Sequence, residues 1–356
     1  MKKTLVAVAA MFAATGAMAD ATISGFLDGA YTIDTTTTSG GVSTKTTTLA
    51  PSGSGQSQIT FAASEDLGGG LKAFANMRFV PDVFNAVTAT SATVAQTGGF
   101  NSDVSEIGVS GAFGTIQLEK GYGIDFMVHA AADASGWTGS STAGVVHNSG
   151  GGTPGQAVVY VLPTMVPGVG VVVARGLGGA TTGAGDAIVY KLTYSAGALA
   201  LQYAGGSVKN AAGVAGTSGF ATDFAIGGNT TAANSDAVTL GSKTSLTALA
   251  VTYDLGMAKL HYGSFGQKNS TDSDLKSSSN MMGVSVPFGA TTVSFTSSSA
   301  KRSSDVALVT KASGTRAKVS YALSKRTTAY GAVGSVRVDG STAANKQTAI
   351  GLTHSF

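Results

Sequence analysis

The feature that most constrains this chain is an alternation of larger apolar and smaller or polar side chains with a period of two residues. Residues 348–356 show it most clearly. One face carries the larger groups and the other the smaller ones: Ile350, Leu352, His354 and Phe356 against Ala349, Gly351, Thr353 and Ser355. The same alternation recurs at 71–79, 188–194, 249–255 and 315–323. A two-residue period is the signature of a β-strand, so the sequence predicts an all-β fold.

The first residues carry the pattern of an export signal. Two lysines, Lys2 and Lys3, precede an apolar run over 5–14, and small residues stand at Ala17 and Ala19. This arrangement is typical of a secretory signal peptide. The alternative, an anchor helix, needs about 20 apolar residues to span a membrane. We therefore expect a signal peptide at 1–19 and a single transmembrane β-barrel domain at 20–356.

Composition excludes several classes of protein. The chain has 50 glycines, 6 prolines and no cysteine, so it needs no disulfides and has no thiolate metal site. Removal of Lys2 and Lys3 leaves 20 basic against 19 acidic residues, a net charge of about +1. No polybasic tract indicates a nucleic-acid partner. After residue 19, no stretch approaches the length and hydropathy of a transmembrane helix.

Tight turns alternate with longer polar stretches along the chain. Seven turns are predicted at 67–69, 113–114, 167–168, 196–197, 255–256, 288–289 and 324–326. Eight longer loops are predicted at about 34–56, 81–102, 121–155, 178–185, 206–242, 267–278, 301–312 and 339–345. Fifteen connections of two alternating kinds imply about 16 antiparallel strands, as in outer-membrane barrels with short periplasmic turns and long extracellular loops.

The physics of the bilayer then favours a closed sheet. In hydrocarbon every backbone N–H and C=O must be paired internally, so a β-protein crosses a membrane only as a barrel. A barrel of about 16 strands encloses water. The alternative, a soluble sandwich, has the same periodicity, but the export signal and the alternation of turns and loops favour the barrel. Aromatic residues near strand ends are expected to form the interfacial girdles: Tyr31, Tyr160, Tyr194, Tyr253, Tyr321, Tyr330 and Phe356.

Several segments, taken in their order and spacing, resemble the Gram-negative general diffusion porins. SGFLDGAY at 24–31 is similar to the first strand of that family, and SQITFAASEDLGGGLKAFANMRF at 57–79 to its second and third. GAFGTIQLEKGYG at 111–123 is similar to the hairpin before the third loop. YALSKRTTAYGAVG at 321–334 and AIGLTHSF at 349–356 are similar to the last two strands. The resemblance implies a 16-stranded outer-membrane barrel, a homotrimer surrounded by outer-membrane lipid. It also implies a wet pore for small hydrophilic solutes and ions, narrowed by an inward third loop.

The resemblance also implies a charged constriction. On the basic wall we expect Lys72, Arg78, Lys120 and Lys191, and on the third loop Asp125 and Asp133. Strict alternation from Ile116 and Leu118 would point Lys120 outward, unless the strand bends at Gly121. The acidic set of the loop is small, which predicts a weak preference for anions. Asp28 and Glu106 also fall on inward positions and would oppose that preference.

Other functions have less support. The four histidines show no metal-binding spacing, no cofactor motif is found, and serine-rich composition alone does not make a catalytic triad, so we expect no enzyme, cofactor or metal. A channel selective for one solute is an alternative, with Tyr122, Phe126 and Trp137 as its aromatic track. A surface or adhesive barrel that does not conduct is a third.

Overall fold

The computed structural model describes most of the strand-forming chain. It covers residues 20–38, 40–81, 84, 100–136, 155–177, 186–209, 243–269, 276–303, 310–339, 342 and 344–356. The expected signal peptide at 1–19 and Trp137 lie outside these ranges.

Seventeen β-segments make up one antiparallel sheet. They are β1 (Asp20–Thr37), β2 (Ser43–Ala50), β3 (Gln58–Gly68), β4 (Leu71–Pro81), β5 (Phe100–Gly111), β6 (Gly114–Gly121), β7 (Gly155–Val161), β8 (Val169–Gly176), β9 (Ala187–Ala196), β10 (Leu199–Lys209), β11 (Lys243–Asp254), β12 (Lys259–Asn269), β13 (Lys276–Phe288), β14 (Thr291–Ser303), β15 (Thr310–Ala322), β16 (Thr327–Val338) and β17 (Ala344–Ser355). The described helix is α2 (Ile124–Ala132). No helix in the described ranges is long and apolar enough to cross a membrane.

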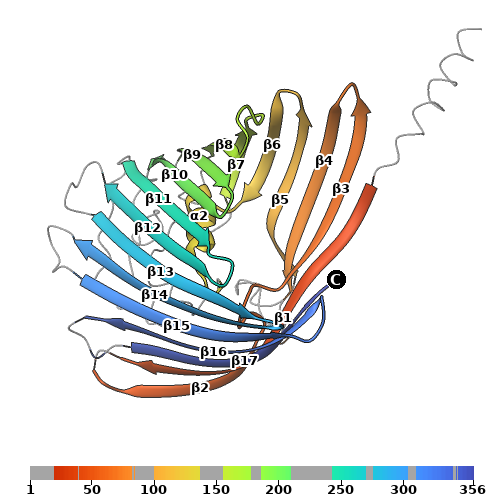
Figure 1. Ribbon diagram of the computed structural model, residues 1–356. Coiled ribbons are helices and arrows are strands. Elements are labelled where there is room, and N and C mark those ends of the chain that lie inside the picture. The colour runs from red at the N-terminus through yellow and green to blue at the C-terminus, as the bar shows by residue number, and fades with distance from the viewer. Residues whose placement is uncertain are drawn as a thin grey trace, which may run out of the picture.

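The sheet closes on itself, as Figure 1 shows. Apart from β2 and β3, which both pair with β1, each strand pairs with the next along the chain, and β1 pairs with β17 to complete the ring, from Phe26 opposite Ser355 to Thr37 opposite Ala344. One wall position is shared by two segments, because the C-terminal half of β1 pairs with β2 and its N-terminal half pairs with β3. The barrel therefore has the predicted 16 strands.

The faces of the strands follow the predicted alternation. Ile350 and Leu352 are 66% and 54% exposed, whereas Ala349 and Thr353 on the opposite face of β17 are buried. A ring of exposed apolar side chains outside a polar interior is the reverse of a soluble protein, and it suits a barrel whose outer solvent is lipid. Six of the seven expected girdle aromatics are exposed. Tyr330 is not: it faces inward and is buried, so that part of the prediction is wrong.

All seven predicted tight turns lie between paired strands at one end of the barrel, here called the turn end. The strand ends that precede and follow the eight longer connections lie at the other end, here called the loop end. One of these connections is shorter than predicted. The sequence placed a loop at 34–56, but β1 continues to Thr37 and β2 returns from Ser43, so the Thr-rich stretch extends the wall as a hairpin. Its threonines have high strand propensity, which loop-like composition concealed.

Candidate functional site

The described part of the third long loop lies inside the barrel, where α2 is visible in Figure 1. Gly121 ends β6, and α2 follows with Asp125 in its first turn, where a carboxylate favours the helix dipole. The apolar face of α2 carries Ile124, Val128 and Ala132. It packs on inward side chains of the wall, which come from β7, β8 and β10–β13: Val159, Ala174, Ala204, Ala248, Ala250, Phe265 and Met281.

The segment after α2 is fixed to the wall through a buried carboxylate. Asp133 Oδ1 accepts hydrogen bonds from Ser135 N at 2.9 Å, Ser135 Oγ at 2.7 Å and Thr296 Oγ1 of β14 at 2.8 Å. Hydrogen bonds to an ionised acceptor are the strong ones, so this contact holds the loop across the lumen.

The segment before α2 is fixed on the opposite wall. Arg78 of β4 makes a bidentate pair with Asp103 of β5, with Nε–Oδ1 at 2.9 Å and NH2–Oδ2 at 2.8 Å. The hydroxyl of Tyr122 donates to Oδ2 of the same carboxylate at 2.9 Å. The centroid of its ring lies 5.3 Å from the guanidinium carbon of Arg78, and the ring stacks on Phe126. Burial and the bond to Asp103 raise the pKa of Tyr122, so it stays a neutral donor.

Asp103 reaches the lumen because of a β-bulge. The register between β4 and β5 shifts where Arg78 faces Val104 and Phe79 faces Ser102, which leaves Asp103 as the extra residue. A bulge re-aims a side chain that strict alternation would place on the other face. The sequence analysis missed Asp103 for this reason.

A second segment folds inward between β2 and β3. Ala30 faces Ala50 and Phe26 faces Gln58, so residues 51–57 stand opposite only 27–29 of β1. Seven residues opposite three cannot continue the ladder. We call residues 51–57 the inner bulge. Its base is closed by Ser57, whose hydroxyl donates to Pro51 O at 2.6 Å and accepts from Asp28 N at 2.9 Å.

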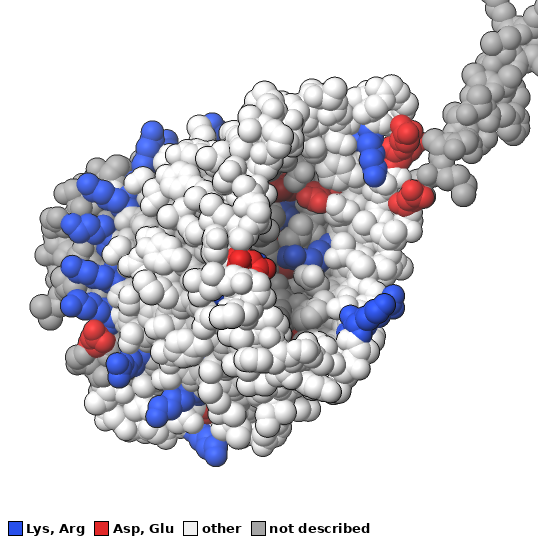
Figure 2. All heavy atoms as spheres, viewed as in Figure 1, with Lys and Arg blue, Asp and Glu red and all other residues white. Residues whose placement is uncertain are grey.

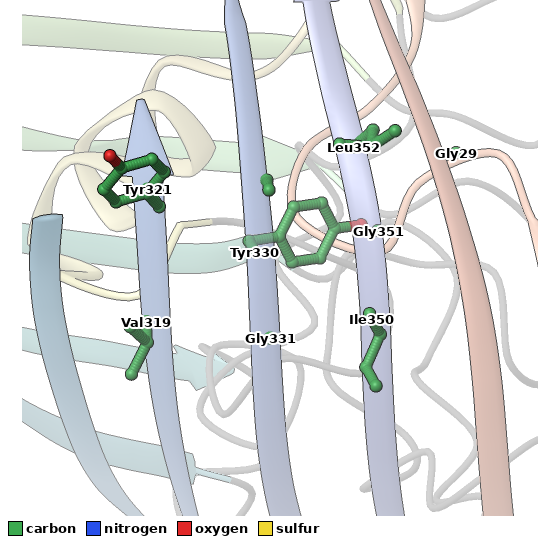
Figure 3. A pocket seen from close by; sticks show the side chains of 9 residues that line it. Gly29, Val319, Tyr321, Tyr330, Gly331, Ile350, Gly351 and Leu352 are labelled. Atoms are coloured by element: carbon green, nitrogen blue, oxygen red, sulfur yellow. The ribbon is translucent and has the colours of Figure 1, made fainter. Parts of the chain in front are cut away.

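The carboxylate of Asp28 holds the inner bulge in place. Its Oδ2 accepts from Ser54 N at 2.6 Å and Gly55 N at 2.7 Å, and its Oδ1 accepts from Tyr330 OH at 2.6 Å. Tyr330 reaches it by extending from β16 over β17 at Gly351, as Figure 3 shows. A Cβ at Gly351 would lie 2.5 Å from Tyr330 OH, so only glycine leaves room for the tyrosine.

The inner bulge contacts the described part of the third loop on both sides of α2. Tyr122 OH is 3.2 Å from Gln56 Oε1. A Cβ at Gly136 would lie 3.1 Å from both Ser54 O and Lys318 Nζ, so Gly136 passes between them. Arg316 of β15 donates to Gly53 O at 2.6 Å, and Lys318 Nζ is 3.2 Å from Ser54 Oγ. The bulge and the loop therefore form one connected inward structure, here called the constriction.

The structure brings together only part of the predicted basic wall. Arg78 and Lys191 face inward, and Lys191 interacts electrostatically with Glu119 across the lumen surface. Lys72 is on the same face of β4 as Arg78 but lies at the turn end and is exposed. Lys120 lies on the outward face and donates to Ser102 O at 2.8 Å. The alternation of β6 continues through Lys120, and the strand does not make the bend at Gly121 that would turn the Lys120 side chain inward.

The predicted loop acids are in the constriction but buried. Asp125 is 5% exposed in α2 and Asp133 is 7% exposed. Asp28 and Glu106 face inward as expected, and Glu106 accepts a hydrogen bond from Gln117. Phe126 is buried and stacks on Tyr122. These two rings therefore pack on each other and do not form the open aromatic track expected of a solute-selective channel. Figure 2 shows basic and acidic side chains together within the opening of the barrel.

The sequence analysis also missed two basic residues of the wall, Arg316 and Lys318. Both alternate with the outward Ala317 and Val319, so the period-two pattern contains them. Nothing in the sequence places a distant glycine-rich segment against them. Among the described residues, no group of three or more His, Cys, Asp or Glu side chains could hold a metal ion.

Comparison with known proteins gives a consistent picture. The family model described as Gram-negative porin matches residues 5–341. No curated protein sequence matches significantly. The anion-selective porin from Comamonas acidovorans is similar in structure, with a TM-score of 0.69 and 20% identity, over 95% of this chain and 100% of that one.

Two further solved structures have the same fold. OmpT of Vibrio cholerae in its trimer form has a TM-score of 0.69 and 13% identity, over 95% of this chain and 99% of the other. Salmonella typhi OmpF in complex with daunomycin has a TM-score of 0.67 and 15% identity, over 94% and 97%. At these identities the likeness establishes the barrel architecture and leaves the details of the lumen to this chain's own residues.

Proposed function

Because this chain belongs to the Gram-negative porin family and is a passive diffusion channel of the outer membrane, we propose that small hydrophilic solutes and ions cross it through the constriction. The observation that carries this proposal is the polar, charged interior of a closed barrel, narrowed by the third loop and the inner bulge. Family and fold indicate a channel rather than an enzyme.

The constriction filters by size and by charge. Its basic side is made by Arg78, Lys191, Arg316 and Lys318, and its acidic side by the loop residues Asp125 and Asp133 together with Asp28 and Asp103. Rings of charged side chains select ions when entry is favourable and binding is weak. Lys72, nearer the turn end, extends the basic side. Lys120 faces outward and takes no part.

A weak preference for anions follows from which charges meet water. The four aspartates are 1–9% exposed and their carboxylates are turned into protein, whereas Lys191 and Lys318 are only partly buried. Glu106 and Glu119 are also partly buried and oppose the preference, so it is small. The Comamonas acidovorans protein of the same fold is an anion-selective porin, which is compatible with this preference.

Two further proposals concern processing and assembly. Residues 1–19 act as an export signal that is removed, leaving 20–356 as the barrel domain. Three copies assemble as a homotrimer in the lipid of the outer membrane. The trimer form of OmpT, with the same fold, supports this assembly. Crosslinking of the purified protein tests it, and a monomer at all protein concentrations would contradict it.

Solute uptake tests the proposed pore. Liposomes containing the purified protein are diluted into isotonic sugars of increasing size, and swelling is followed by light scattering. We expect swelling rates that fall steeply with sugar size and do not saturate with concentration. Rates equal to those of protein-free liposomes would contradict the pore. Uptake of one sugar that saturates and is blocked by its close analogues would favour a solute-selective channel.

A further inference from the structure

Two glutamates face each other on the lumen wall, on the turn-end side of the constriction. Glu106 of β5 and Glu119 of β6 are register partners. Both point inward, because their neighbours Ile107 and Leu118 are exposed on the outer face. Glu119 lies two residues before Gly121, where the third loop begins. Like charges directly opposite each other destabilise a sheet, so this pair needs a partner that holds it in place.

The side-chain amide of Gln117 connects the two carboxylates. Its Nε2 donates to Glu106 Oε2 at 3.0 Å and to Glu119 Oε2 at 2.7 Å. An amide nitrogen carries two protons, so this one group can donate to both acceptors at once. The other oxygen of Glu106 accepts a hydrogen bond from Nδ2 of Asn76 on β4. Neutral donors therefore hold both carboxylates against the wall.

The wall around Gln117 leaves room for this bridge. Gly108 of β5 stands opposite Gln117 on one side and opposite Phe74 of β4 on the other. A Cβ at Gly108 would lie 2.8 Å from Gln117 Cβ and 2.6 Å from Phe74 Cζ, so a side chain there would displace both. From this position Gln117 extends toward Glu106 and Glu119, each of which lies one inward position nearer the loop end.

The other charged groups at this wall leave the glutamate pair with a net negative charge. Lys191 of β9 interacts electrostatically with Glu119. Arg78, the next inward residue after Asn76 on β4, makes its bidentate pair with Asp103 instead. One lysine against two glutamates is a centre of negative charge beside the path of ions. How far the two carboxylates project into the lumen then decides how strongly the pore attracts cations.

We propose that Gln117 is a positioning residue for ion selectivity, because its amide bridges Glu106 and Glu119 and keeps both carboxylates at the wall. Without the amide, the two like charges turn apart into the water of the lumen and come closer to passing ions. The bridge therefore limits the attraction of the pore for cations. This inference rests on the proposed channel function, and it assigns to one neutral side chain a part in the balance between anion and cation passage.

Reversal potentials in a gradient of dilute potassium chloride test the proposal, at a mildly alkaline pH that keeps both carboxylates ionised. Q117A removes the bridge without a change of charge. Q117N keeps an amide that is one methylene shorter and does not reach both carboxylates. T115A is the matched control, since Thr115 is the previous inward residue of β6 and lies opposite Ser110. Each substitution is also made in an E106Q/E119Q background, and heat-modifiable gel migration shows that the variants are folded.

We expect Q117A to lower the anion-to-cation permeability ratio about threefold, and Q117N to change it in the same direction. Two unit charges that move from about 8 Å to about 6 Å from a passing ion change this ratio by about that factor in water, since they act on anions and cations with opposite sign. In the E106Q/E119Q background neither substitution should change the ratio. T115A should leave the ratio unchanged in both backgrounds.

An unchanged ratio in Q117A and Q117N channels would overturn the proposal, and so would an equal shift in channels that lack both glutamates. An equal shift in T115A would also overturn it, because the loss of any side chain from this wall would then have the same effect. Channels that conduct without the shift refute the role of Gln117 alone. Folded protein that does not conduct refutes the proposed channel and this inference with it.

Discussion

Replacement of Asp28 by alanine should release the inner bulge from the wall. The Asp28 carboxylate accepts two backbone N–H groups of the bulge, at 2.6 and 2.7 Å, and is 1% exposed. A hydrogen bond to a charged group contributes about 1.5–3 kcal/mol, so the two together hold the bulge by about 3–6 kcal/mol. A factor of ten corresponds to about 1.4 kcal/mol, so the held position is favoured by more than ~100-fold. Without the carboxylate this preference disappears.

The readout is single-channel recording in a planar bilayer. For D28A we expect greater open-channel noise and a conductance higher by roughly 1.5-fold, because a seven-residue segment no longer stays in one place in the lumen. Two controls separate the clamp from other effects. Y330F removes only the contact to Oδ1 and leaves both bulge amides bonded. D28N removes the charge but keeps an acceptor oxygen for the amides.

Both control variants should therefore show the open-channel noise and nearly the conductance of the unmodified channel. Y330F should lower the free energy of unfolding by about 1–2 kcal/mol, because the second carboxylate oxygen loses its buried donor. If D28A were as quiet as the unmodified channel, the inner bulge would not be held by Asp28. If D28N were as noisy as D28A, lumen charge would be the cause, and the hydrogen-bonded clamp would not.

Three further perturbations follow from the same geometry. K318Q should lower the anion-to-cation permeability ratio by up to about tenfold in dilute salt, since a positive charge about 6 Å from a passing ion favours an anion and disfavours a cation by roughly 0.7 kcal/mol each in water; an unchanged reversal potential would oppose this. Deletion of residues 53–56 leaves three residues of the inner bulge opposite residues 27–29 of β1, and it should raise conductance more than D28A does. A conductance equal to that of the unmodified channel would contradict the inner bulge as a second inward element. Gly351→Val should prevent heat-modifiable gel migration, since its Cβ meets Tyr330 OH, and normal migration would contradict the crowding.

The architecture was predictable from the sequence because one local rule repeats in every strand. Alternation assigned the outward Ile350 and Leu352 and the inward Arg78 without any knowledge of distant contacts. The seven turns were equally visible, since six of them contain glycine, which has a local turn signature. Strand number follows from counting connections, and closure follows from the need to pair every backbone group in hydrocarbon.

The constriction was predictable only in part, because it depends on breaks in that rule. Asp103 lies in the lumen through a bulge that shifts the register by one residue. The inner bulge is a glycine- and serine-rich stretch with the composition of an exposed loop, and it is held inward by hydrogen bonds to β1 and to residues of β15 that are up to 264 residues away. At Lys120 the alternation continues unbroken, so its side chain faces outward. Its predicted place in the basic wall required a bend at Gly121 and was wrong.

The conductance of the purified protein in a planar bilayer, measured against salt concentration, tests the central claim most directly. A wet lumen behind an apolar outer face predicts discrete steps whose size rises in near proportion to bulk conductivity. The ratio of anion to cation permeability should be only slightly above one. Absence of steps from folded, heat-modifiable protein would contradict the account, since it would mean that the barrel encloses no continuous path of water.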